Sequence, residues 1–172
     1  MHRYDEKFVP QHFAKTLDGF AKEVLSKEVY QARGVKGLQL MDIKILYFLD
    51  DFRGDIKVPL TVNDWSWGGV FNQSGIRVPK EGSYSQHFYG NAVDFRTRHK
   101  TGHELRKHFI ENKENYPQIS FVEVGPVKKN GEWVDMTWFH GDVRTRTDWD
   151  GVRYWSPKHG FVTEEFVLEN KL

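Results

Sequence analysis

A histidine and an aspartate lie seven residues apart in the segment SYSQHFYGNAVDFR, which runs from Ser83 to Arg96. Both side chains can bind zinc, but two atoms bound to one ion lie within about 4 Å of each other. A helix would separate His87 and Asp94 by about 10 Å along its axis. A two-residue turn at Gly90-Asn91 would instead place them opposite each other, with Cβ atoms about 5 Å apart. The spacing therefore predicts a hairpin that presents two ligands to one ion.

A candidate third ligand lies further along the chain, in the segment MTWFHGDV. If this segment is a strand, alternation places His140 and Asp142 on one face, and Asp135 and Thr137 on the other. Spacing alone leaves two interpretations of His87 and His140, which are a shared zinc site or two partly buried histidines beside aromatic side chains. Of the six other histidines, His103 and His108 lie on the polar part of a predicted helix, where solvated side chains are expected. Terminal or loop positions are expected for three more: His2, His12 and His159.

The composition limits the remaining chemistry. The chain has 172 residues, no cysteine and a formal net charge of +1. Without cysteine there is neither a disulfide nor a thiolate site, so zinc would have to be held by His, Asp or Glu. The small net charge predicts no nucleic-acid partner and no polybasic contact with a membrane. We expect one domain over residues 1–172 and a monomer.

The N-terminal sequence MHRYDEKFVPQHF contains no apolar core of a signal peptide. No stretch approaches the roughly 18 apolar residues that a membrane span requires. We therefore expect a protein that is cytoplasmic when made and that does not insert into a membrane.

Helical periodicity indicates three helices that could support the site. Apolar residues recur at helical spacing over residues 5–30, although Pro10 and Gly19 weaken this pattern. The run from Leu38 to Phe52 carries a stronger apolar stripe, which Gly54 would end. A third, amphipathic helix is predicted from Thr101 to Asn115, with Thr101 and Glu104 forming a capping box.

Three segments read as strands, namely residues 57–63, 119–125 and 132–146, and a turn at 129–131 would join the last two into a hairpin. The long aromatic stretch between residues 64 and 85 is predicted to be a functional loop. Hairpin-linked strands mixed with helices predict an α+β fold. We expect an antiparallel sheet with helices packed on one face and the ligands on the other.

Two motifs in this chain resemble those of a known family. Residues Ser85, His87, Gly90, Ala92 and Asp94 match the pattern S-x-H-x-x-G-x-A-x-D of the zinc D-Ala-D-Ala carboxypeptidases and peptidoglycan endopeptidases. The later segment WFHGD is similar to the second motif of that family. The resemblance covers about residues 38–144 and is closest in kind to phage-type members. It implies a fold similar to that of the Hedgehog and D-Ala-D-Ala peptidases.

The resemblance also implies Zn²⁺ held by His87, Asp94 and His140, with an open fourth position. Three protein ligands and one open position are typical of catalytic zinc, whereas structural sites are closed by four ligands. Such a site still needs a carboxylate that takes a proton from water and passes it to the leaving amine. The family usually places this Asp or Glu three residues before the last histidine, where this chain has Thr137.

Three carboxylates could replace the missing one. Glu123 is placed first, because a turn at 129–131 would bring it opposite residue 137. Asp135 is close in sequence to His140 but faces away from it unless a bulge turns the strand. Asp142 shares the face of His140. A carboxylate two residues past a ligand histidine more typically orients the histidine ring through a hydrogen bond and does not act as the base.

Two further residues of the motif region have expected roles. The resemblance implies that Arg77, in the segment SGIR, binds the substrate carbonyl or a peptide carboxylate, because its guanidinium offers a fixed fork of donors. The alternative for Arg77 is an ion pair with Glu81. Ser85 is expected to support the backbone of the site, as serine does in turns.

The resemblance implies a metallopeptidase that hydrolyses a peptide bond in the stem or cross-link of bacterial peptidoglycan, as a carboxypeptidase or an endopeptidase. The absence of a signal segment suits a phage lysis enzyme released through a separate pore, or a virion component that acts on the cell wall. Because position 137 lacks a carboxylate, a second function remains open. This is a non-catalytic, zinc-containing module of the same fold that binds the cell wall or a protein.

Overall fold

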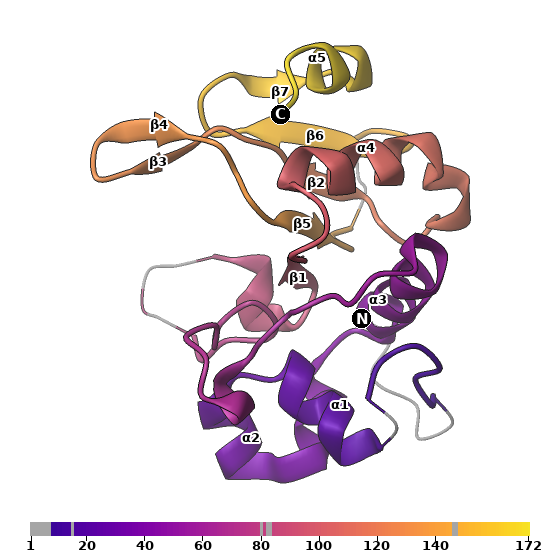
Figure 1. The fold of residues 1–172 in the computed structure, drawn as a ribbon, viewed down its shortest axis with the longest axis vertical. Helices are drawn as coiled ribbons and strands as arrows, with labels where there is room; N and C mark the ends of the chain where they lie inside the picture. Colours follow the sequence, from indigo (N-terminus) through magenta and orange to yellow (C-terminus); the bar gives the residue numbers. More distant parts are fainter. Residues whose placement is uncertain (1–7, 15, 80, 82–83, 146–147) are drawn as a thin grey trace.

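A mixed five-stranded sheet forms the centre of the computed structural model, which describes residues 8–14, 16–79, 81, 84–145 and 148–172 (Figure 1). The strand order is β1-β5-β2-β6-β7. The strands are β1 (Ala92–Phe95), β2 (Phe121–Glu123), β5 (Phe139–Asp142), β6 (Arg153–Ser156) and β7 (Gly160–Val162).

The α+β prediction is confirmed, but the expectation of an antiparallel sheet is wrong at one pair. Strand β5 pairs antiparallel with both β1 and β2, and β6 pairs antiparallel with β7. Strands β2 and β6 run parallel. Because both edges of β5 are already occupied, the chain that leaves β5 passes beyond β2 before it pairs again.

Five α-helices and four short 3₁₀ helices are present in the described residues. Each α-helix follows a Ser, Thr or Asp whose side chain accepts a hydrogen bond from a backbone N–H of the first turn, as N-caps do. The helices are α1 (Leu17–Val24), α2 (Lys27–Arg33), α3 (Ile43–Ile56), α4 (Gly102–Glu111), α5 (Glu164–Glu169), η1 (Gly34–Leu40), η2 (Trp65–Trp67), η3 (Gln86–Tyr89) and η4 (Lys113–Asn115).

The predicted helices are present with changed boundaries. The capping box of Thr101 and Glu104 is confirmed at the start of α4. The helical pattern over residues 5–30 divides into α1 and α2, because Ser26 caps a new helix, and residues 5–7 lie outside the described part.

The helix expected from Leu38 to Phe52 begins later and ends later than predicted. Asp42 caps α3, so the residues before it form the separate helix η1. Gly54 does not end α3, which continues to Ile56. A Cβ at Gly54 would lie 2.7 Å from the His12 ring, so this glycine permits close packing rather than a helix stop.

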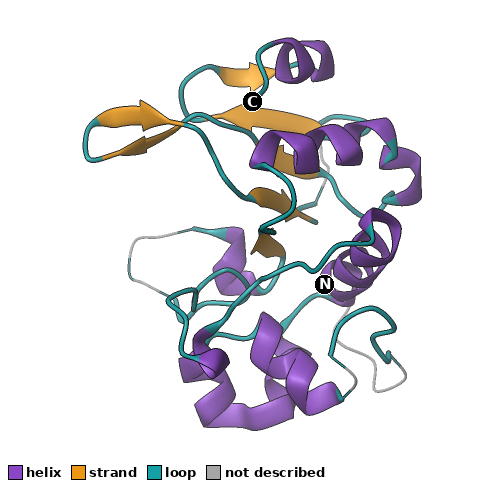
Figure 2. Cartoon of the chain, viewed as in Figure 1, coloured by secondary structure: helices purple, strands orange, loops and turns teal. Residues whose placement is uncertain are grey.

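Helix α4 lies beside the sheet and α3 lies next to it (Figure 2). A cluster of buried aromatic rings joins both helices to one face of the sheet. The Phe48 ring of α3 contacts Phe95 of β1, Phe139 of β5 and Phe109 of α4 at centroid distances of 5.7–6.1 Å. Phe95 and Phe139 stack on each other at 4.9 Å. These helices therefore pack on one face of the sheet, as predicted, and the residues that alternate with Phe95 and Phe139 face the other way.

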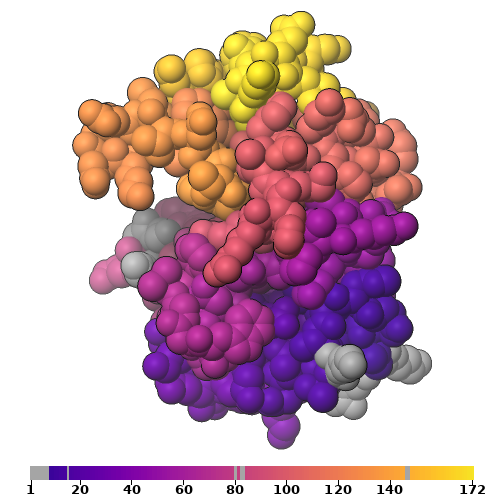
Figure 3. Space-filling model, in the orientation of Figure 1, coloured from indigo at the N-terminus to yellow at the C-terminus, as the bar shows by residue number. Residues whose placement is uncertain are grey.

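Two strand predictions are wrong in part. Residues 57–63 form only an isolated bridge between Thr61 and Arg96, in a segment where Pro59 lacks a backbone donor. The turn at Asn130-Gly131 exists, but it joins β3 (Val127–Lys129) to β4 (Glu132–Val134) in a separate two-stranded sheet. This hairpin projects from the body of the protein (Figures 1 and 3).

In the described residues, no helix has both the length and the apolar character needed to cross a membrane.

Gly90 connects η3 to β1 in a left-handed conformation, with φ of 70°. Its carbonyl accepts a hydrogen bond from Asp42 N, and a Cβ at this position would lie 2.1 Å from Leu40 O. Gly131 also has a positive φ, of 88°, but open space surrounds it. The two glycines thus share the backbone constraint and differ in packing.

We predict that Gly131→Ala lowers the free energy of unfolding by about 1 kcal/mol, the cost of a left-handed alanine. Gly90→Ala should lower it by about 2–4 kcal/mol, because steric overlap with the backbone of η1 adds to that cost. Urea unfolding of the two variants measures both values. Equal destabilisation by the two substitutions would contradict the packing role of Gly90.

Candidate metal centre

Three ionisable residues form one row across the sheet on the face opposite the aromatic cluster. Asp94 of β1 lies directly opposite His140 of β5, and His140 lies directly opposite Glu123 of β2. Directly opposed residues share a face of the sheet, with Cβ atoms about 5 Å apart. The strand register therefore gathers two potential ligands and a carboxylate without any contribution from the loops.

His87 reaches this row from the helix η3, which precedes β1. The predicted hairpin around Gly90-Asn91 is wrong, because Phe88 N donates to Ser85 O and Gly90 N donates to His87 O, which closes a 3₁₀ turn. The His87 ring nevertheless faces Asp94, with 3.5 Å between Nε2 and Oδ1. His87 and Asp94 therefore lie close together as predicted, but a 3₁₀ helix rather than a hairpin brings them together.

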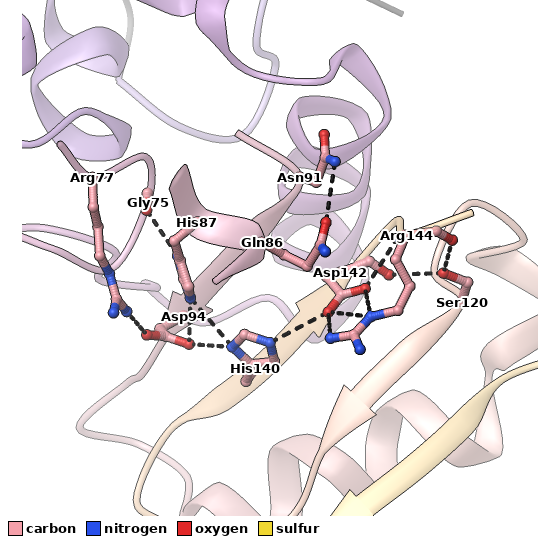
Figure 4. Close-up of polar contacts among 10 residues, drawn as sticks. All are labelled: Gly75, Arg77, Gln86, His87, Asn91, Asp94, Ser120, His140, Asp142 and Arg144. Atoms are coloured by element: carbon pink, nitrogen blue, oxygen red, sulfur yellow. Dashed lines mark hydrogen bonds and ion pairs between the residues drawn. The ribbon is translucent and has the colours of Figure 1, made fainter. Parts of the chain in front are cut away.

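The donor set fits a zinc ion. His87 Nε2, Asp94 Oδ1 and His140 Nδ1 are separated by 3.4 Å between the rings and by 3.5 and 2.7 Å from each ring to the carboxylate (Figure 4). Two ligands of tetrahedral zinc lie about 3.3 Å apart, given metal–ligand bonds of about 2.0–2.1 Å. All three residues are buried, and in the described part of the chain they form the only group of this kind. They could hold a metal ion.

Neighbouring groups orient both histidine rings. His87 Nδ1 lies 2.8 Å from Gly75 O, so this nitrogen donates to the carbonyl and leaves the lone pair of Nε2 for a metal. His140 Nε2 faces the fully buried Asp142 at 3.7 Å, which directs Nδ1 toward Asp94. Asp142 in turn accepts hydrogen bonds from Arg144.

The charges of the row favour a cation between Asp94 and the rings. Burial alone would raise the pKa of Asp94, but hydrogen bonds from His140 and His87 hold this pKa well below its usual range. Burial lowers the pKa of His140, and its contacts with Asp142 and Asp94 outweigh this and raise the pKa to about 10. A proton on His140 thus neutralises Asp94, and a metal ion would supply positive charge at the same point.

Arg77 holds the second oxygen of Asp94. Its Nη2 donates to Asp94 Oδ2 at 2.9 Å, and its Nε donates to Gln73 O. The structure therefore pairs Arg77 with Asp94 rather than with Glu81, the alternative expected from the sequence. Because Arg77 occupies Oδ2, Oδ1 remains directed at the two histidines.

The three candidate carboxylates lie in different surroundings. Glu123 is half-buried, and its carboxylate makes no hydrogen bond or ion pair within the described residues. Burial raises the pKa of Glu123, Asp94 adds to this effect, and His140 opposes it. Asp135 is exposed and lines a different cavity, beside Arg106. Asp142 lies behind His140, where it is bound to Arg144.

The pairing of β2 with β5 explains why Glu123 lies beside His140. The sequence predicted that it pairs near residue 137, but its partner is His140. The turn at Asn130-Gly131 connects β3 to β4 and not β2 to β5. The pairing of β2 with β5 is therefore independent of that turn. Thr137 is exposed and lies before β5 begins.

Ser85 and Arg144 complete the surroundings of the row. The backbone carbonyl of Ser85 accepts a hydrogen bond from Phe88 N, whereas its side chain makes no capping hydrogen bond, so the side-chain support expected from the sequence is not seen. Arg144 was not predicted to take part in the site, although strand alternation from His140 and Asp142 places it on the same face. The carbonyl of Gly75 leaves no signal in a sequence, because every residue carries one.

Comparisons of this chain with family models, with curated proteins and with solved structures find no match.

We predict one zinc ion per chain, bound by His87, Asp94 and His140. Elemental analysis after dialysis should find about one equivalent in the native protein and little in the His87→Ala/His140→Ala double variant. His159→Ala is the matched control. It removes an exposed histidine that directly precedes β7, and it should retain the metal. Stoichiometric zinc in the double variant would show that the ligands are others.

Proposed function

We propose that this protein is a zinc-dependent peptidase that hydrolyses a peptide bond in bacterial peptidoglycan. The observation that carries the proposal is the convergence of His87 Nε2, Asp94 Oδ1 and His140 Nδ1 within 4.8 Å of one another. Three ligands without a fourth from the described residues correspond to a catalytic rather than a structural zinc site.

A cavity of about 530 Å³ adjoins this site and could admit a peptide. Asp94 and Arg77 line it together with Arg96, Trp138 and the loop around Phe71. When bound, zinc supplies Lewis-acid polarisation of a carbonyl and acidifies a water molecule. Arg77 orients Asp94 and keeps further N–H donors for a substrate carbonyl.

Glu123 is the proposed general base and acid. Its carboxylate lies in the row beside His140, is free of hydrogen bonds within the described chain, and has a raised pKa because it is partly buried. A carboxylate with a raised pKa can accept a proton and return it to a leaving amine within one catalytic cycle. Asp142 is committed to Arg144, so we assign it the orientation of His140.

Peptidoglycan as the substrate rests on the two motifs that resemble the D-Ala-D-Ala carboxypeptidase and endopeptidase family. Residues from both motifs supply the donor set, which is the arrangement that the resemblance requires. In this proposal the fold is of the Hedgehog and D-Ala-D-Ala peptidase type. The protein would act on the cell wall as a phage lysis enzyme or virion component.

A non-catalytic zinc module that binds the cell wall is the second candidate. The observation that favours it is Thr137, which is exposed and stands where the family usually has its carboxylate. The two candidates differ in whether purified peptidoglycan releases peptide fragments or new amino termini when the zinc-loaded protein is added. A chelator should abolish this release if the protein is an enzyme.

We predict that Glu123→Gln lowers the rate of peptidoglycan hydrolysis by about 10²–10⁴-fold, because the proton carrier is lost. Zinc content should remain unchanged, since Glu123 is not among the three ligands. Asp135→Asn is the matched control, and it should retain nearly full activity because Asp135 lies in another cavity. Loss of activity in Asp135→Asn but not in Glu123→Gln would reverse this assignment, and full activity in both would direct attention to Asp142.

A further inference from the structure

Arg96 lies on the same face of the sheet as Asp94, two residues further along the chain. Its backbone is fixed by two hydrogen bonds to Thr61, at 2.8 and 3.0 Å. Arg96 thus directly follows β1, the strand that supplies the candidate metal ligand Asp94.

The guanidinium of Arg96 is held in place, but among the described residues it makes no direct ion pair. It lies over the Phe71 ring, with Cζ 3.6 Å from the centroid, and Nη2 donates weakly to Ser74 Oγ at 3.4 Å. Its Nε is buried and has no hydrogen-bond partner. Among the described residues, no carboxylate oxygen lies within the 4.0 Å ion-pair distance of Arg96, whereas Arg77 and Arg144 are paired with Asp94 and Asp142.

The position of Arg96 links two cavities. It lines the 530 Å³ cavity that contains Asp94 and Trp138. It also lines a second cavity of about 620 Å³, which extends along Trp67 and Phe71 toward the exposed Arg98. A peptide whose scissile bond lies at the metal site would pass Arg96 as it extends from one cavity into the other.

The acidic groups of these cavities are engaged elsewhere. Asp64 accepts a hydrogen bond from Phe71 N at 2.7 Å, which shapes the loop between residues 64 and 71. Asp94 is shared between Arg77 and the two histidines. Both carboxylates attract the charge of Arg96 at longer range, but in the described chain neither accepts a hydrogen bond from it.

A half-buried guanidinium without a direct ion pair is costly, because N–H groups such as its Nε–H lose water without gaining an acceptor. Stacking on Phe71 fixes the plane of the guanidinium, and the fork of N–H donors in such a group suits a planar acceptor. Carboxylate is the group in peptides that matches this fork in both charge and geometry.

We propose that Arg96 binds a carboxylate of the substrate peptide and thereby makes the site select acidic peptides over their amidated forms. The inference rests on the proposed function, because it takes the ligand of this site to be a cell-wall peptide. It assigns to Arg96 the carboxylate contact for which the sequence suggested Arg77.

Three synthetic peptides test this proposal. The first is the stem peptide L-Ala-γ-D-Glu-L-Lys-D-Ala-D-Ala with both carboxylates free, the second carries D-isoglutamine in place of D-isoglutamate, and the third ends in a carboxamide. Calorimetric titration of the zinc-loaded protein, repeated after chelation so that hydrolysis cannot interfere, gives the Kd of each. We expect one of the two amidations to weaken binding by about 10- to 100-fold, the value of a charged hydrogen-bonded pair.

Arg96→Gln should remove this preference, so that it binds the free and amidated peptides alike. Arg98→Gln is the matched control, because it makes the same change of charge at an exposed arginine of the same cavity, and it should keep the preference. Arg96→Lys should keep part of it, since the charge remains without the fork. The comparison of peptides on the native protein does not depend on how well any variant folds.

Equal affinity of the native protein for all three peptides, or no binding of any of them, would overturn the proposal. An equal loss of preference in Arg98→Gln would also overturn it, because a general field rather than a defined subsite would then be responsible. The outcome is separable from the proposed enzyme activity. Carboxylate-selective binding without hydrolysis would refute the peptidase and keep the subsite, whereas hydrolysis without selectivity would do the reverse.

Discussion

The register of three neighbouring strands is the constraint on which the site depends. Asp94, His140 and Glu123 share one row because β5 pairs with β1 on one side and with β2 on the other. A shift of one residue between β1 and β5 would turn a ligand toward the aromatic cluster and a phenylalanine toward the site, and a shift of β2 would turn Glu123 away from the site. The chemistry of the row is thus a property of backbone pairing, which no single side chain determines.

The aromatic cluster protects this register from the opposite face. Phe95 and Phe139 are immediate neighbours of Asp94 and His140, and they are fully buried against α3 and α4. Any slip of β1 or β5 would expose these rings to water, at a cost of several kcal/mol. Apolar packing therefore fixes polar residues that contribute little to the core themselves. Arg77 and Arg144 then hold Asp94 and Asp142, the two carboxylates that contact His140.

The residues that form the site could be predicted from the sequence more accurately than the backbone conformation that positions them. The spacing of His87 and Asp94 excluded a helix, but it could not distinguish a hairpin from the 3₁₀ turn that forms, because both reverse the chain within a few residues. Local signals such as the capping box of Thr101 were sufficient, since both partners lie within one turn. The pairing of Glu123 was misplaced by three residues, because register depends on a partner strand and not on the nearest turn.

Helices and strands that depend on contacts between residues far apart in the sequence are harder to predict from local sequence patterns. Strands β6 and β7 and helix α5 were not predicted, and the parallel pairing of β2 with β6 follows only from the occupied edges of β5. The exposed state of Thr137 and the open donors of Arg96 are likewise results of packing. Sequence patterns report which residue types are present, whereas burial and pairing decide which of them remain free to react.

The origin of His87 outside the sheet has a further consequence. Its ring is held by Gly75 O and its backbone by Arg77 N, and the adjacent Ile76 forms a bridge with Leu25 at the end of α1. A metal ion shared by His87 and His140 would therefore act as a cross-link between the N-terminal helical layer and the sheet, closing a loop of 53 residues. Such a closure lowers the entropy of the unfolded chain. Loss of the metal would then lower the stability of the helical layer and of the sheet together, because the ion joins them.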